Sequence, residues 1–152
     1  MASRCRSSGF TLIELLTVVA LLAIFASIAI PSFTAFVDSN RTQAVASELK
    51  SLLLFARSEA VSRRAETTVS VTNDAATVSL NSQTLRSVAL DRVIGVNSAP
   101  ASLSFLPDGR ASKNIVFTIP KQHDSACYHT DIALSGFISQ SSGELNESGS
   151  CG

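Results

Sequence analysis

An apolar run near the start of the chain is its longest continuous pattern. Between Phe10 and Ile30 only four positions are polar: Thr11, Glu14, Thr17 and Ser27. As a helix this run would be roughly 31 Å long, at about 1.5 Å per residue, which is enough to cross the hydrocarbon core of a bilayer. It predicts one membrane-spanning helix that contains a single charged residue, Glu14, and meets Pro31 at its end.

The segment from Thr34 to Arg64 has the pattern of an amphipathic helix. Its apolar positions recur at spacings of three and four, and they are Val45, Leu49, Leu52, Leu53, Ala56 and Ala60. Charged residues lie between them, and neither Gly nor Pro interrupts the segment. We expect one long helix, kinked near Pro31, whose first half lies in a membrane and whose second half packs its apolar stripe on a sheet.

After Arg64 the pattern changes to an alternation of period two. Two segments rich in Val and Thr predict a hairpin: Thr67–Thr72 and Ala76–Leu80, separated by Asn73-Asp74-Ala75. Further candidate strands are Leu85–Val96 (one strand or two), Leu103–Phe105, Asn114–Ile119 and Asp131–Ile138, with a turn at Leu106-Pro107-Asp108-Gly109. A Ser- and Gly-rich tail follows, which needs Cys151 to order it. These elements predict an α+β fold, in which a long N-terminal helix packs on a mainly antiparallel β-sheet.

Size and charge narrow these expectations. The 152 residues, 45% of them hydrophobic, suffice for one globular domain but not for two of ordinary size. Arg4 and Arg6 precede the apolar run, and the positive-inside rule then predicts a cytoplasmic N-terminus with everything after the run across the membrane. Without these two of the 12 basic residues, ten remain against 12 acidic ones. The exported part is therefore weakly acidic, and its net charge does not favour nonspecific binding of nucleic acid.

The three cysteines fit this topology. Cys5 lies in the cytoplasmic flank, whereas Cys127 and Cys151 lie in the exported part, where an oxidising compartment favours a disulfide between them. The bridge would close the C-terminal tail into a loop and stabilise the fold by about 3 kcal/mol in the chain-entropy model. The alternative is two free thiols.

Glu14 leaves three interpretations of the N-terminus. An ordinary signal peptide would be cut at the small-x-small site Ser27-Ile28-Ala29, but a carboxylate inside its apolar region costs a few kcal/mol on insertion scales, so we disfavour it. A plain membrane anchor could keep Glu14 near the interface. The third interpretation rests on a longer stretch of sequence.

The basic segment Arg4 to Gly9, followed by Phe10-Thr11-Leu12-Ile13-Glu14-Leu15-Leu16, resembles the class III leader junction of type IV pilins and pseudopilins. The resemblance implies that a prepilin peptidase cuts after Gly9 and that Phe10 gains an N-methylated amine. It also implies that Glu14, the fifth mature residue, pairs with the Phe10 amine of a neighbouring subunit as the helices stack into a filament. A carboxylate that is costly alone in lipid becomes tolerable beside an ammonium, so this interpretation explains why Glu14 is there.

Two shorter motifs narrow the resemblance. The helix segment from Leu52 to Val61, with Leu53, Ala56, Arg57, Glu59 and Ala60, is similar to the "L-x-x-A-R-x-E-A" helix of the GspH/FimT group, and Phe105-Leu106-Pro107-Asp108-Gly109 is similar to its "F-x-P-x-G" turn. The resemblance spans essentially the whole chain and implies a pilin-like fold. Members of this group start and tip type IV pili, cap secretion pseudopili, or bind incoming DNA.

DNA binding by this chain is possible but not favoured. DNA-binding members of the group carry "G-R-x-R" near the C-terminal end, where this chain has Gly136-Phe137-Ile138-Ser139. No Lys or Arg follows Lys121, while four acidic residues do: Asp124, Asp131, Glu144 and Glu147. Such a tail repels a phosphate backbone. A patch formed by Arg63, Arg64, Arg110 and Lys113 is the alternative to scattered, solvated charges.

The sequence gives little support for a catalytic site or a metal-binding site. His123, Cys127 and His129 are close in sequence, but two His and one Cys make an incomplete tetrahedral set, and Cys127 has an expected disulfide partner. The sequence contains no phosphate-binding glycine loop, metalloprotease helix or nucleophile elbow. We predict neither an enzyme nor a bound metal or cofactor.

The working hypothesis is a FimU-like minor type IV pilin of the bacterial inner membrane. Residues 1–9 would be the cleaved leader, 10–36 the transmembrane and filament-core helix, 37–65 an amphipathic helix on the sheet, and 66–152 a β-rich periplasmic domain. Its partners would be the prepilin peptidase, the membrane, and other minor and major pilins at the filament tip. The alternatives are a GspH-like pseudopilin of type II secretion, a FimT-like DNA-binding pilin, and a singly anchored envelope binding domain that keeps its leader.

Overall fold

The computed structural model describes residues 10–72, 74–90, 96, 101–121, 125–146 and 151. Gly9 and the rest of the predicted leader, as well as His123, lie outside these residues. The chain divides into two compact units between Val37 and Asp38, and each is described by itself below. Helix α1, Leu12–Arg63, contributes to both units.

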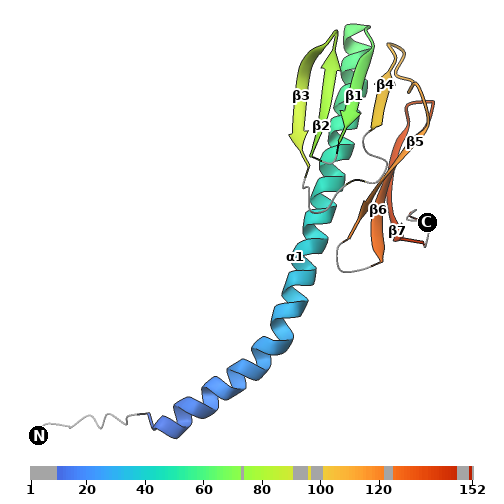
Figure 1. The fold of residues 1–152 in the computed structure, drawn as a ribbon. Coiled ribbons are helices and arrows are strands. Elements are labelled where there is room, and N and C mark those ends of the chain that lie inside the picture. Colours follow the sequence, from blue (N-terminus) through green and yellow to red (C-terminus); the bar gives the residue numbers. More distant parts are fainter. Residues whose placement is uncertain are drawn as a thin grey trace, which may run out of the picture. The chain divides into compact units, whose positions relative to one another are not determined.

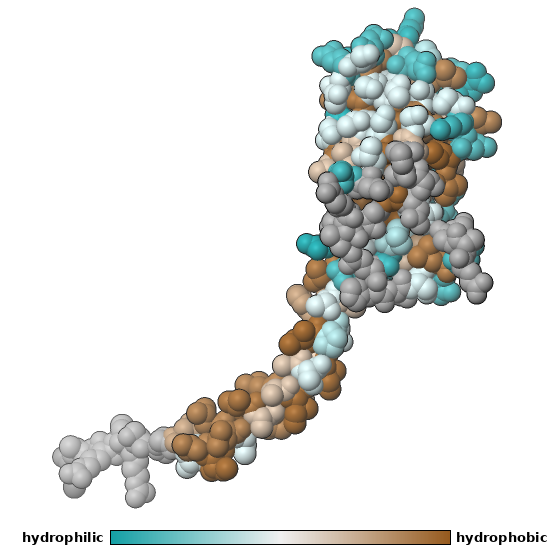
Figure 2. All heavy atoms as spheres, viewed as in Figure 1, coloured by the Kyte–Doolittle hydropathy of each residue, from teal (hydrophilic) through white to brown (hydrophobic). Residues whose placement is uncertain are grey.

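The first unit consists of the N-terminal part of α1, and its surface is apolar. Every residue from Phe10 to Phe36 is exposed, and Figure 2 shows a mostly hydrophobic surface along this stretch. Pro31 lies inside the helix and does not end it. Proline has no N–H for the helical hydrogen bond, which is the physical reason to expect a kink at this position. The kink stays a prediction.

The second unit contains the rest of α1 and seven described strands: β1 (Thr67–Val71), β2 (Ala75–Leu80), β3 (Gln83–Ala89), β4 (Ala101–Phe105), β5 (Ile115–Pro120), β6 (Ala126–Ile132) and β7 (Ile138–Glu144). They form a four-stranded sheet of order β3-β2-β1-β4 and a three-stranded sheet of order β5-β6-β7 (Figure 1). All pairings are antiparallel. The structure thus confirms the long helix on antiparallel strands, but the strands form two sheets instead of one.

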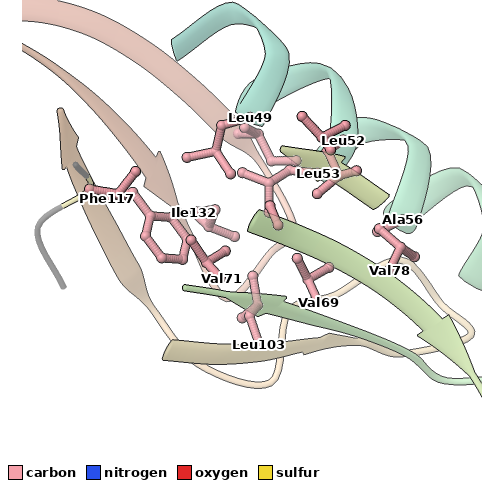
Figure 3. Packing of buried hydrophobic residues seen from close by; sticks show 14 of the residues in the cluster. Leu49, Leu52, Leu53, Ala56, Val69, Val71, Val78, Leu103, Phe117 and Ile132 are labelled. Atoms are coloured by element: carbon pink, nitrogen blue, oxygen red, sulfur yellow. The ribbon is translucent and has the colours of Figure 1, made fainter. Parts of the chain in front are cut away.

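The core lies between the helix and the two sheets. Leu49, Leu52 and Leu53 of α1 are completely buried, as the helical period predicted. Figure 3 shows these side chains facing residues of both sheets, namely Val69, Val71, Val78, Leu103, Phe117 and Ile132. Because one apolar stripe contacts both sheets, this half of α1 holds them in one hydrophobic core.

The last predicted strand, Asp131–Ile138, is wrong. Asp131 and Ile132 end β6, Ile138 begins β7, and the residues between them form a turn. In this turn Gly136 has a φ of 77° and donates its N–H to the Ala133 carbonyl at 2.8 Å. The alternation of Ile132, Leu134 and Ile138 imitates a strand, but the chain reverses at a glycine that adopts a positive φ without steric penalty.

Two other expectations also change. The Ser- and Gly-rich tail, which we expect from the sequence to be ordered only if Cys151 ties it down, supplies β7, which pairs with β6 along its whole length and consists mainly of polar residues. The strand predicted at Leu85–Val96 is β3, which begins at Gln83 and ends at Ala89; residues 91–95 lie outside the described part.

The predicted hairpin is confirmed as β1 and β2, joined in the register Val71 to Ala76.

Candidate functional site

The first candidate site is the start of α1. Phe10 is 75% exposed. The backbone N–H of Glu14 donates to Thr11 Oγ1 at 3.3 Å, which makes Thr11 the N-cap of the helix. Glu14 stands three residues after that cap, at the position of the acidic residue in a capping-box sequence, and in this first turn its charge interacts favourably with the positive end of the helix dipole. Glu14 therefore has a local role that the sequence interpretation did not consider.

Nothing within the described residues neutralises Glu14, since no cationic side chain lies within ion-pair distance of its exposed carboxylate. By length and composition α1 qualifies as a membrane-spanning helix, and none of its most apolar window is buried within the structure. An exposed apolar helix with one carboxylate is stabilised by an apolar surrounding, and within that surrounding by a cation beside the carboxylate. Pairing of Glu14 with the Phe10 amine of a neighbour supplies the cation and remains a prediction, as does cleavage after Gly9.

The second candidate site joins the two short motifs noted in the sequence. Arg57, from the helix motif, donates from Nε to the carbonyl of Gly109 at 3.0 Å, across 52 residues. Gly109 is the glycine of the Phe105–Gly109 turn and has a φ of 83°. The turn closes through the Gly109 N–H, which donates to the Leu106 carbonyl at 2.8 Å. One arginine therefore fastens the turn to the helix.

Gly136 packs directly against this junction. A Cβ at Gly136 would lie 1.9 Å from the Gly109 carbonyl oxygen and 3.0 Å from Arg57 Nε. The Ala111 N–H also donates to the Leu134 carbonyl at 3.1 Å, so the turn after β4 and the turn between β6 and β7 lie side by side. Only glycine leaves room for this approach of two backbones.

Asp108 stabilises the same turn from outside. Its carboxylate accepts from the Arg110 backbone N–H at 3.0 Å and from Arg110 Nε at 2.7 Å. The backbone hydrogen bond from Arg110, followed by the side-chain hydrogen bond, holds the pKa of Asp108 below its usual value. This contribution to turn stability is therefore present above the usual aspartate pKa and is lost as the pH falls through the lowered one.

The third candidate site is the C-terminal tail. Cys127 and Cys151 form a disulfide with their Cα atoms 6.0 Å apart. Cys127 is completely buried in β6, and Cys151 also forms a β-bridge with Leu145. The bridge thus ties the chain beyond β7 back to the middle strand of the three-stranded sheet.

The described residues contain no group of three or more His, Cys, Asp or Glu side chains that could hold a metal. His129 lies in β6 with Nε2 2.7 Å from Ser141 Oγ and 3.4 Å from Asp131. Its Nδ1 is buried and has no hydrogen-bond partner there. Ser141 and Asp131 both contact the same nitrogen of His129, Nε2, so the three side chains do not form the relay of a catalytic triad.

The four basic residues that could form a patch are partly neutralised. Arg63 pairs with Glu59, and Arg110 pairs with Asp108. Where DNA-binding members of the group would carry arginines, Phe137 is exposed and Ser139 is half-buried. This part of the surface is apolar instead of basic.

Comparisons with known proteins agree with this arrangement. The prokaryotic N-terminal methylation motif matches residues 4–30, which include the start of the exposed apolar helix. Such a motif, leading into a helix packed on antiparallel sheets, defines a pilin-like protein. The model of the family described as Type II transport protein GspH matches residues 45–136. The chain belongs to this GspH family and, as the sequence motifs predicted, to the minor pilins and pseudopilins of the GspH/FimT group.

Solved structures share the fold. The type IV minor pilin FimU of Pseudomonas aeruginosa, in two crystal forms, is 22% and 23% identical, with TM-scores of 0.58 and 0.60. The matches cover 65% and 70% of this chain and 91% and 92% of the FimU chains. The minor pseudopilin EpsH of the Vibrio cholerae type 2 secretion system is 13% identical over 66% of this chain and 96% of its own, with a TM-score of 0.57. Among curated proteins none matches the sequence significantly.

Proposed function

We propose that this chain is a minor type IV pilin that helps to start pilus assembly and stays at the filament tip. The observation that carries the proposal is the apolar helix from Phe10 to Phe36, exposed throughout and bearing one carboxylate at the fifth position after the expected cut. Pilins and pseudopilins are structural subunits, and we propose no catalytic role and no cofactor.

The proposal includes a route to the filament. The prepilin peptidase removes residues 1–9 at the inner membrane, and Phe10 is then N-methylated. Residues 10–36 cross the membrane and later enter the filament core, residues 37–65 pack on the sheets, and residues 66–152 form the periplasmic domain. Glu14 pairs with the Phe10 amine of a neighbouring pilin, which draws the helix out of the lipid.

A role as a minor pseudopilin of type II secretion is the second candidate. It is favoured by the description of the matched family and by the likeness to EpsH. We place the pilus first because FimU shares 22% to 23% of aligned residues with this chain and EpsH shares 13%. DNA reception ranks below both, because Phe137 and Ser139 provide no cation for a phosphate backbone.

Deletion and complementation in the native bacterium test the proposal. Surface pili recovered by shearing, secreted proteins in the medium and uptake of added DNA would be measured in the same cultures. We expect few or no pili after deletion, normal secretion, and recovery of pili when the wild-type chain is restored. Normal pili with lost secretion would establish the pseudopilin role instead. Normal pili with lost DNA uptake would favour the DNA receptor.

A further inference from the structure

Exposed apolar side chains lie on α1 and on the turn between β6 and β7, the two elements that meet at Arg57. Four of them are large: Leu54, Val61, Leu134 and Phe137, with exposed fractions of 46%, 49%, 53% and 64%. On α1 a shallow groove of about 400 Å³ is lined by Leu54, Arg57, Ser58, Val61 and Ser62. Their spacing of three and four places them on one side of the helix. We call the groove together with Leu134 and Phe137 the Arg57 surface.

The turn between β6 and β7 adjoins the groove. A Cβ at Gly136 would lie 3.0 Å from Arg57 Nε, and one at Gly109 would lie 3.1 Å from Val61 Cγ2. Phe137 directly follows Gly136, and Leu134 precedes it by two residues. The groove and the turn therefore meet at Arg57, and each carries exposed apolar side chains.

Arg57 gives this surface an uncompensated positive charge. Its Nε is bound to the Gly109 carbonyl, and no carboxylate among the described residues forms an ion pair with its guanidinium. The nearest acidic residue in sequence, Glu59, is paired with Arg63. A partly buried guanidinium with remaining N–H donors is suited to bind a carboxylate at two points.

We propose that the Arg57 surface docks a neighbouring pilin-like subunit, through a segment that presents an apolar side chain beside a carboxylate. The apolar side chain enters the groove between Leu54 and Val61, and the carboxylate binds Arg57. A nucleic acid would require a basic stripe, whereas this surface has one cation among four apolar side chains. Arginine and aromatic residues in such a setting are typical hot spots of protein interfaces.

The inference rests on the proposed function, which also selects the occupant. The proposed function places this chain beside other pilins at the filament tip, so the docked segment belongs to a different pilin-like subunit.

Photo-crosslinking of the full-length chain in the native bacterium tests the contact. A photoreactive phenylalanine would replace Phe137 or Leu54, and Thr84, exposed in β3, would be the control position. We expect crosslinks from Phe137 and Leu54 to one pilin-like subunit and none from Thr84. Crosslinks to a second copy of this chain, to DNA or to lipid alone would overturn the proposal.

Charge variants of Ser58 test the chemistry. Ser58 is exposed beside Arg57, and its hydroxyl donates to the Phe55 carbonyl of its own helix. In Ser58→Glu the new carboxylate would occupy Arg57 and repel that of the partner, so the amount of this chain in sheared filaments should fall about tenfold. Ser58→Lys and, in β3, the matched control Ser87→Glu should stay within about twofold of wild type, since they leave this pairing intact.

The two hypotheses fail in different ways. If the wild-type chain is absent from filaments, the proposed function fails, and this inference fails with it. If the wild-type chain is present, but Ser58→Glu enters filaments equally well and Phe137 crosslinks to no subunit, only this inference is overturned. Disulfide formation and protease resistance of each variant show whether it has folded.

Discussion

Arg57 shows how much of this fold depends on single residues. It contacts a turn 52 residues away, and Gly136 packs against both partners of that hydrogen bond. The sequence identified the helix motif and the turn motif separately, because each is a local pattern. Their contact could not be predicted, since it depends on how the helix and two turns meet in the folded unit.

Gly136 and Gly109 should differ in their tolerance of a side chain. Gly136→Ala places a Cβ 1.9 Å from a backbone oxygen at a φ of 77°, so unfolding free energy should fall by about 3 kcal/mol or more. Gly109→Ala meets a side-chain methyl at 3.1 Å and should cost about 1–2 kcal/mol. Thermal melts in detergent would compare both with Ser135→Ala, a control in the same turn. Equal stability of the two glycine variants would contradict the close approach.

Glu14 has two possible roles that one substitution separates. Glu14→Gln keeps a capping-box residue three positions after Thr11, but it removes the charge that a neighbouring amine would bind. We expect Glu14→Gln to insert and be cleaved normally, yet to be at least about tenfold depleted in sheared filaments. Thr17→Ala, which loses only a hydroxyl bound to its own helix, is the control. Wild-type incorporation of Glu14→Gln would show that Glu14 serves the helix end and not assembly.

At the scale of elements, the helices and strands that could be predicted from the sequence are those whose apolar residues recur with a regular period. The buried stripe of α1 and the β1–β2 hairpin follow from spacings that alone decide which side chains face the core. Strand β7 was missed because Ser139, Gln140, Ser141 and Ser142 carry no apolar alternation. Its position is fixed by pairing with β6, which is a tertiary effect that local propensity does not contain.

The disulfide should matter most for this edge of the three-stranded sheet. Cys151→Ala removes a bridge between residues 24 apart in sequence and leaves the buried Cys127 in place. The free energy of unfolding should fall by about 3 kcal/mol in the chain-entropy model. Hydrogen exchange should accelerate in β7 and remain unchanged in β1 and β2. Reduced wild-type protein is the control, and it should behave like the variant; equal melting of oxidised and reduced protein would contradict this role.

At the scale of the whole molecule, the chain combines two units with opposite surfaces. The second unit buries its apolar stripe in its own core, whereas the first exposes every side chain from Phe10 to Phe36. A helix with such a surface is stable only in lipid or among other helices. We therefore expect the apolar part of α1 to be covered by a membrane or by other subunits, in agreement with the family of the chain.

We predict that processing at Gly9 decides which of these surroundings the chain reaches. Expressed with a prepilin peptidase, the protein should begin at Phe10 and carry one added methyl group on its amine. Without the peptidase, or as Gly9→Leu, it should keep residues 1–9 and stay in the membrane, because the leader adds the charges of Arg4 and Arg6 ahead of Phe10 in the sequence and a charged leader resists entry into an apolar filament core. N-terminal sequencing and intact mass distinguish these products. A chain cut after Ala29 would be an ordinary secreted protein, and one left uncut in both strains would be a single anchored domain without a filament role.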